Sequence, residues 1–210
     1  MSQKIVVSVD PYEARAALLE GDRLINVEIE NAAVGKRKGN IYKGRVSKIE
    51  DSIEAAFIDY GVGKDGFLPF DEVSDRSLAE LTGHPRASNN SGLSEGDWVL
   101  VQVTKEEIGK KGASLTMHIS LPGRFVVLTP FSNRIGVSRK LVSEERTRLK
   151  QIASQLVFPD GFGCIMRTVG KNEQITDIQA DLEGLLRAWE DVLEGFKSAK
   201  EAQEIHSESG

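Results

Sequence analysis

Apolar and polar positions alternate along much of residues 36–121, with a period of two that is typical of half-buried strands. Glycine-bearing turns separate five such segments, which are 41–48, 55–60, 66–69, 98–104 and 115–120. The alternate positions of a segment place a set of apolar side chains on one face, as Val99, Val101 and Val103 do. Closing these strands into a barrel gives the apolar faces a common interior. The pattern therefore predicts a small five-stranded β-barrel over residues 36–121.

The residues before the barrel predict a strand at 5–9, a short helix over 12–20, and a strand at 25–29 within a hairpin. The helix is indicated by a run rich in Ala and Leu, and the strands by β-branched residues or alternation. Three such short elements are too little to form a core alone. The apolar strands are therefore expected to have exposed edges or unburied faces.

The residues after the barrel predict a different, mixed architecture. Strands are expected at 124–129, 136–141 and 163–169, and a helix is expected to begin at Ser143. A second, longer helix is indicated by apolar residues at helical spacing, namely Ile175, Ile178, Leu182, Leu185, Leu186, Trp189, Leu193 and Phe196. Residues 199–210 form a polar tail that is expected to be frayed. The whole chain is thus predicted to be a β-rich α+β protein.

Composition narrows the range of partners. The chain has 210 residues, a formal net charge of −5 and a sequence pI of about 5.4, which excludes a uniformly basic nucleic-acid binder. Six bases nevertheless lie between residues 36 and 48 without an intervening acid. The single cysteine, Cys164, excludes a disulfide within the chain and fits a reducing cytoplasm. The sequence indicates neither a secretory signal nor a membrane span.

Two neighbouring strands each carry a phenylalanine close to these bases. Phe57 stands on the face opposite to Ala56 and Ile58, so the alternation predicts that Phe57 points out of the barrel. A phenylalanine in a strand usually belongs to the core, and only the alternation of inward and outward positions argues against a core position here. Outward rings beside cations suit unpaired bases and phosphates of single-stranded RNA. The residues expected to converge on this face are Phe57, Phe67, Lys43, Arg45 and His118.

A charged connection, residues 105–112, joins the last two strands of the predicted barrel. Its lysines, Lys111 among them, are placed to touch phosphates. A charged hairpin tip that is merely solvated explains the same composition, so both interpretations stay open for this segment.

The motifs of the barrel region resemble the S1-type RNA-binding domain of the ribonuclease E/G family. The matching stretches are NIYKGRV at 40–46, EAAFIDYG at 54–61, GFLP at 66–69 and KEEIGKKGASLT at 105–116. The resemblance continues, in the family's order, through ISLPGRFVVL at 119–128, GVSRK at 136–140 and MRT at 166–168. An S1-type match alone is common among RNA-binding proteins, whereas the motifs after Gly123 are more restricted to this family.

The resemblance implies four regions and a set of site residues. Residues 1–35 would be part of an RNase H-like subdomain, 36–121 an S1-type domain of the OB fold, 122–198 a 5′-sensor and 199–210 a tail. By matching position, Arg167 and Thr168 would contact a 5′-terminal phosphate, with Gly123 and Val127 lining its pocket. A guanidinium offers a planar donor fork to phosphate, and a hydroxyl adds another donor.

The resemblance also implies the setting of these sites. Members of the family are homo-oligomeric, Mg²⁺-dependent endoribonucleases that act in RNA processing and decay, with metal ligands in a later DNase I-like domain. No acidic residue of this chain matches such a ligand, so no metal or catalytic residue is assigned here. We expect a fragment that binds 5′-monophosphorylated single-stranded RNA without cleaving it alone.

Two other interpretations stay open on sequence grounds. One is a free-standing S1-type RNA-binding or regulatory protein. The other is a structural or protein-binding module that uses the long apolar helix as an interface. RNA affinity that weakens steeply with salt would argue against the second interpretation, because phosphate contacts release counterions.

Overall fold

The computed structural model describes residues 3–9, 13–31, 37–82, 91–109, 111–138 and 143–208. The chain divides into two compact units, residues 1–37 and 38–210. None of the helices in the described part of the chain is long and apolar enough to span a bilayer.

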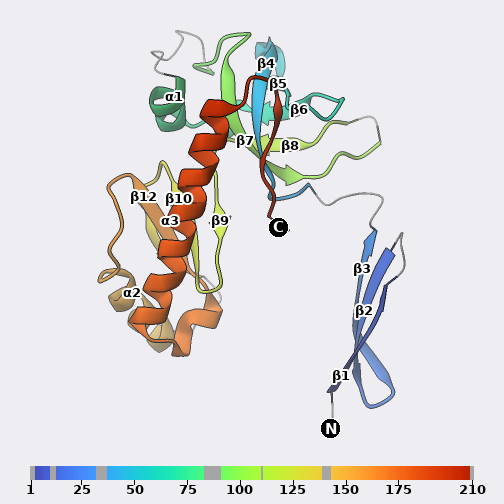
Figure 1. The fold of residues 1–210 in the computed structure, drawn as a ribbon, viewed down its shortest axis with the longest axis vertical. Helices are drawn as coiled ribbons and strands as arrows, with labels where there is room; N and C mark the ends of the chain where they lie inside the picture. Colours follow the sequence, from blue (N-terminus) through green and yellow to red (C-terminus); the bar gives the residue numbers. More distant parts are fainter. Residues whose placement is uncertain are drawn as a thin grey trace. The chain divides into compact units, whose positions relative to one another are not determined.

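The first unit is a three-stranded antiparallel sheet. It consists of β1 (Gln3–Val9), β2 (Glu13–Glu20) and β3 (Arg23–Asn31), in that order across the sheet (Figure 1). The helix expected over 12–20 is wrong, because residues 13–20 form the central strand. Ala and Leu favour helices only weakly, and β2 gains backbone partners along both edges from the β-branched strands beside it.

Apolar side chains remain exposed in this unit, as the sequence led us to expect. On β1, Ile5 and Val9 expose 68% and 73% of their surface, and on β3, at the other edge of the sheet, Leu24 and Ile29 expose 54% and 57%. The exposed set also includes Val6, Val7, Ile25 and Val27. Because the set includes adjacent residues, which point to opposite sides of a strand, both faces of the sheet carry exposed apolar groups.

The second unit begins with the predicted barrel. Its strands are β4 (Ile41–Glu50), β5 (Ala55–Asp59), β6 (Gly66–Pro69), β7 (Trp98–Lys105) and β8 (Ser114–Thr116). They pair in the order β4-β5-β6-β8-β7, and pairing of β4 with β7 closes the barrel. The first half of β4 pairs with β7 and the second half with β5, and Arg45 pairs with both. A bulge between Val46 and Lys48 lies within the half that pairs with β5. The connections contain η1 (Asp51–Ile53), η2 (Phe70–Glu72) and α1 (Asp75–Thr82).

The barrel interior is filled by the residues that the alternation placed inside. Val99, Val101 and Val103 are buried there, together with Tyr42, Val46, Ala56, Ile58, Tyr60, Leu68, Leu115 and Met117. Gly44 has no room for a side chain, since a Cβ would lie 2.4 Å from the Ile58 methyl carbon. Ile119, expected inside the barrel with Leu115 and Met117, belongs instead to a second core.

Residues after the barrel form a four-stranded sheet with helices. The strands β9 (Leu121–Pro122), β10 (Val126–Pro130), β11 (Ile135–Val137) and β12 (Phe162–Met166) are ordered β11-β12-β10-β9. The helices are α2 (Ser143–Ala153) and α3 (Ile175–Ser198), with η3 (Thr168–Asn172) between β12 and α3. The three expected strands exist with shifted ends, and residues 139–141 of the second lie outside the described residues. Strand β9 was not anticipated.

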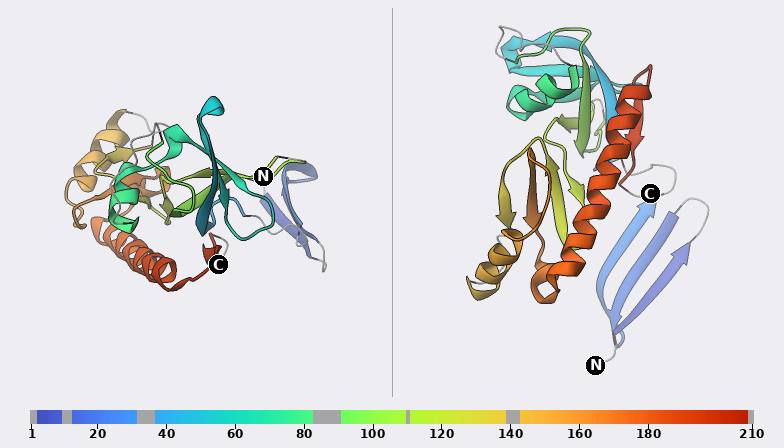
Figure 2. Two further views of the ribbon diagram at one scale, coloured as in Figure 1. Left: turned by 90° about the horizontal axis from the view of Figure 1, so that it is seen from above. Right: turned by 60° about the vertical axis from the view of Figure 1, so that its left-hand side comes forward.

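Helix α3 joins the barrel to this sheet. Its expected apolar stripe is confirmed, with Ile178, Leu182 and Trp189 buried against the sheet. The same core contains Ile41 of β4 and Leu100 of β7, which lie on the outer side of the barrel. In Figures 1 and 2, α3 runs along both the sheet and the barrel. The barrel and the following sheet are therefore parts of one compact unit.

The expectation of a frayed tail is wrong over residues 203–206. These residues form β13 (Gln203–His206), which pairs antiparallel with the start of β4. The Glu204 carboxylate accepts hydrogen bonds from the Tyr42 hydroxyl at 2.8 Å and the Asn40 amide at 3.0 Å. β7 occupies one edge of this end of β4, and β5 does not reach the other edge, so a polar segment finds backbone partners there that its composition did not indicate.

Candidate nucleic-acid interface

The two phenylalanines of the barrel lie directly opposite each other on β5 and β6. Phe57 pairs with Phe67 in the strand register, and their ring centroids are 6.0 Å apart at an interplanar angle of 69°. Both side chains are half-buried, whereas Ala56, Ile58 and Leu68 beside them are fully buried. The predicted outward direction of Phe57 is thus confirmed, and the pair forms a partly exposed aromatic platform.

The charged connection 105–112 is anchored beside this platform. Gly112 lies against the turn between β5 and β6, where a Cβ would be 2.0 Å from the Asp65 carbonyl oxygen. The Phe67 amide donates to the Ala113 carbonyl at 2.8 Å, and Lys64 donates to the Gly109 carbonyl at 2.9 Å. Lys111 is exposed in this connection. The connection that bears Lys111 is therefore anchored to the chain positions that precede Phe67.

Arg45 lies on the outer side of β4, as the alternation predicts. Its guanidinium carbon is 5.8 Å from the centroid of the Trp98 ring, and its Nε donates to the Gly96 carbonyl at 3.4 Å. Arg45 pairs across the ladder with Asp59, two residues beyond Phe57. It remains exposed, although its described contacts are with Trp98 and Gly96 rather than with the phenylalanines.

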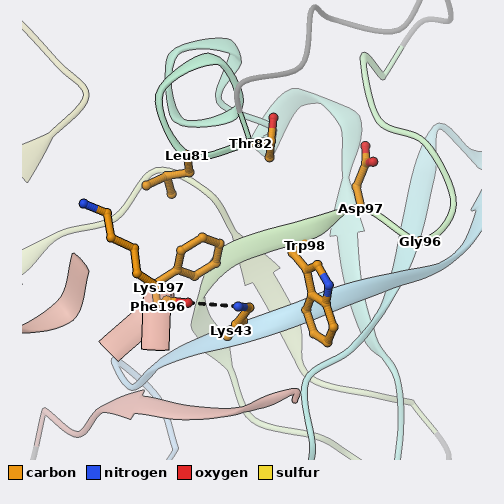
Figure 3. A pocket seen from close by; sticks show the side chains of 8 residues that line it. All are labelled: Lys43, Leu81, Thr82, Gly96, Asp97, Trp98, Phe196 and Lys197. Carbon is orange, nitrogen blue, oxygen red and sulfur yellow. Dashed lines mark hydrogen bonds between the residues drawn. The ribbon is translucent and has the colours of Figure 1, made fainter. Parts of the chain in front are cut away.

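Lys43 does not lie with the aromatic platform, which corrects the expected convergence. Its amine donates to the carbonyl oxygen of Phe196 at 2.9 Å, at the C-terminal end of α3 (Figure 3). It also donates to the carbonyl oxygen of Ala199, directly after this helix, at 2.7 Å. The amine also lies 5.0 Å from the Trp98 ring centroid and 4.8 Å from that of Phe196. Burial lowers the pKa of this amine. The physical reason is that α3 covers this part of the outer barrel face, where a cation complements the carbonyl end of a helix.

His118 is exposed beyond the end of β8 and lines a different hollow. A pocket of about 490 Å³ contains His118 together with Thr116, Ser120 and Val127. Val127 belongs to β10, so the pocket lies between the barrel and the second sheet. The same pocket is thus lined by His118, which was expected on the barrel surface, and by Val127, which was expected near the phosphate.

Arg167 and Gly123 meet, although they are far apart in the sequence. The Arg167 guanidinium donates to the Gly123 carbonyl oxygen, and the Arg167 amide donates to the Phe125 carbonyl at 2.8 Å. Arg167 is exposed, and Thr168 follows it as the first residue of η3. Arg148 of α2 fixes the other end of η3 by donating to the carbonyls of Lys171 and Glu173. An exposed guanidinium thus directly precedes a braced turn that begins with a threonine.

The loop that bears Gly123 is organised by a residue that the sequence did not single out. The Asp181 carboxylate of α3 accepts hydrogen bonds from the amides of Arg124, Phe125 and Val126 at 3.0, 2.7 and 3.1 Å. The available signal was an acid beside the apolar stripe of α3, between Ile178 and Leu185. Within the described part of the chain, no group of three His, Cys, Asp or Glu side chains is arranged to hold a metal ion.

Comparisons with known proteins agree with this division of the second unit. Residues 36–118 match the S1 RNA binding domain, and residues 120–210 match the ribonuclease E/G family. This chain belongs to the ribonuclease E/G family. The S1 match contains all five barrel strands, and the ribonuclease E/G match runs from β9 through β13.

Relatives in the ribonuclease E/G family match along the whole chain. Ribonuclease E of Haemophilus influenzae is 40% identical over 100% of this chain and 23% of the relative. Ribonuclease E of Escherichia coli is 39% identical over 100% of this chain and 20% of the relative. Ribonuclease G of Escherichia coli is 33% identical over 99% of this chain and 43% of the relative. The chain thus spans less than half of the length of these relatives.

Proposed function

We propose that this chain binds single-stranded RNA and recognises a monophosphate at its 5′ end. The observation that carries the proposal is the exposed Arg167 guanidinium, held at the Gly123 carbonyl with Thr168 at the adjoining turn. A fixed guanidinium loses little freedom when it binds the oxygens of a terminal phosphate, and its planar fork suits two of them.

The aromatic platform supplies the second part of the proposal. Phe57 and Phe67 present ring surface on an S1 barrel, with Lys111 exposed on the neighbouring connection. Stacking on an aromatic ring accepts any base and contributes roughly 1–3 kcal/mol per base. The platform would therefore hold the strand without regard to its 5′ end, while Arg167 and Thr168 would test that end.

The names of the relatives suggest the wider role. In longer members of the family, which are ribonucleases, we infer that this region holds and orients the RNA that is cleaved. The region would then contribute to RNA processing and decay by favouring substrates with a 5′-monophosphate.

A binding titration tests the proposal. Two short RNAs of the same sequence, one with a 5′-monophosphate and one with a 5′-hydroxyl, are titrated with the chain at several salt concentrations. We expect tighter binding of the monophosphorylated RNA, loss of this preference in Arg167→Ala, and partial loss in Arg167→Lys, which keeps the charge but not the fork. Arg187→Ala, on the exposed side of α3, is the matched control.

Two outcomes would contradict the proposal. Equal affinity of the parent chain for the two RNAs would overturn recognition of the 5′ end. Absence of RNA binding at any salt concentration would overturn the proposal as a whole and favour a protein-binding module.

A further inference from the structure

The loop from Gly123 to Val126 is wrapped around one carboxylate. Oδ1 of Asp181 accepts from the Arg124 amide, and Oδ2 accepts from the amides of Phe125 and Val126. The loop also closes on itself, since the Gly123 amide donates to the Val126 carbonyl at 2.8 Å. Three consecutive backbone donors converging on an ionised acceptor define the loop conformation more tightly than neutral hydrogen bonds would.

The carboxylate itself is held in place by the helix that carries it. Ile178 and Leu182, on either side of Asp181 along α3, have no exposed surface and lie in the second core. Asp181 therefore cannot follow the loop if the loop moves. Gly123 approaches so closely that a Cβ would lie 2.7 Å from the Asp181 carboxylate and 2.9 Å from Leu185 Cδ1. A side chain at position 123 would therefore force the loop or the helix side chains to shift.

The two carbonyls of this loop that face β12 are the partners of Arg167. The Gly123 carbonyl accepts from the guanidinium and the Phe125 carbonyl accepts from the Arg167 amide. The position of the guanidinium is thus set by a loop whose own position is set by Asp181. Asp181 and Arg167 therefore bind different groups of the same loop, the carboxylate its amides and Arg167 its carbonyls.

We infer that Asp181 is a positioning residue that sets the Arg167 guanidinium for a 5′-terminal phosphate and so determines the preference for that end. The inference rests on the proposed function. Asp181 acts through the loop and need not touch RNA. Its effect is therefore confined to RNA that presents a 5′-phosphate, while binding through the aromatic platform is independent of it.

Asp181→Asn is the first variant to examine, since it keeps the shape of the side chain. The amide group of asparagine has a donor NH₂ in place of one carboxylate oxygen. This NH₂ faces either the Arg124 amide or the amides of Phe125 and Val126, so the hydrogen bonds at that end of the side chain are lost. We expect affinity for 5′-monophosphorylated RNA to fall about fivefold, the factor that corresponds to one hydrogen bond of about 1 kcal/mol. Affinity for 5′-hydroxyl RNA is expected to stay unchanged. Asp177→Asn, one turn earlier on α3 and exposed, is the matched control.

A double variant separates positioning from a general structural effect. If Asp181 acts through Arg167, Arg167→Ala combined with Asp181→Asn discriminates no worse than Arg167→Ala alone. If the losses of 5′ preference caused by the two single substitutions add in the double variant, Asp181 acts by another route and the inference is wrong. Should Asp181→Asn fail to fold, Asp181→Glu keeps the charge and shifts it by one methylene, and the same two RNAs are measured with it.

The outcomes distinguish this inference from the proposed function. A parent chain without 5′ preference overturns both. The role of Asp181 alone is overturned if the parent chain prefers the 5′-monophosphate, Arg167→Ala loses this preference, and Asp181→Asn keeps it. If Asp181→Asn does not fold, the same criterion applies to Asp181→Glu. Equal weakening towards both RNAs would show that Asp181 only supports the fold.

Discussion

The guanidinium of Arg167 donates a hydrogen bond to the carbonyl oxygen of Gly123, although 44 positions separate the two residues. This bond joins the turn after β12 to the loop before β10. It brings together two residues that the sequence placed in one pocket only by resemblance. The bond also explains why the site depends on a loop without secondary structure, because a carbonyl in that loop orients the cation.

Replacement of Gly123 by alanine should disturb this site. The new Cβ would lie within 2.7 Å of the Asp181 carboxylate, so the loop must shift and carry its carbonyls away from Arg167. We expect Gly123→Ala to reduce the preference for 5′-monophosphorylated RNA, measured as the ratio of the two dissociation constants. Gly136→Ala is the control, since its Cβ would make an ordinary contact of 3.6 Å with Ile165. An unchanged ratio in Gly123→Ala would show that the loop is not part of the site.

Removal of either platform ring should weaken RNA binding independently of the 5′ end. Loss of one stacking partner costs roughly 1–3 kcal/mol, or about 5- to 150-fold in affinity. We therefore expect Phe57→Ala and Phe67→Ala to weaken binding of both RNAs by the same factor. Ile135→Ala, an exposed apolar residue on β11, should change neither affinity. A selective loss towards monophosphorylated RNA would place the rings at the 5′ end instead of along the strand.

Lys43 should contribute to stability rather than to RNA binding. Its amine satisfies two carbonyls at the end of α3, and Lys43→Met keeps the stem but leaves both without this donor. We expect the free energy of unfolding in urea to fall by about 2 kcal/mol. Lys48→Met removes an exposed amine paired with Glu50 and should change stability by less than about 0.5 kcal/mol. A Lys43→Met variant as stable as the parent, with weakened RNA binding, would reverse this assignment.

Cys164 should be unreactive in the folded chain. Burial raises the pKa of its thiol to about 11 from a usual 9.0. The thiolate is the reactive form, so alkylation at pH 8 should be much slower in the folded chain than in urea. An added cysteine at an exposed position, Val157→Cys, should react rapidly. Fast alkylation of Cys164 under native conditions would mean that the second core opens readily.

The raised pKa of Cys164 also makes the stability of the folded chain depend on pH. The folded state favours the neutral thiol, so its contribution is complete below pH 9.0 and is lost as the pH rises towards about 11. Comparison of the parent chain with Cys164→Ala across this range, by urea unfolding, isolates the contribution. The difference in stability between the two chains should change in this window and be constant below it.

Local sequence patterns predicted those helices and strands that bury one face along their whole length. The alternation around Val99, Val101 and Val103 identified the barrel, and helical spacing identified α3, because one buried face imposes a period on the sequence. The same reasoning failed at β2 and β13. β2 takes its backbone partners from β1 and β3, which flank it in the sequence, and β13 takes its partner from the distant strand β4. Their own residues carry a helical or merely polar signature, which does not show that these partners exist.

Sequence by itself determined, apart from Ile119, which of the predicted side chains lie inside the barrel, and resemblance indicated the pair Gly123 and Arg167. Only the tertiary structure decided which outward residues remain accessible. Phe57 and Lys43 both point out of the barrel, yet α3 covers Lys43, whose amine meets a carbonyl 153 positions away, while Phe57 keeps part of its ring exposed. A period of two distinguishes the two sides of a strand, but it carries no information about what a later helix packs upon.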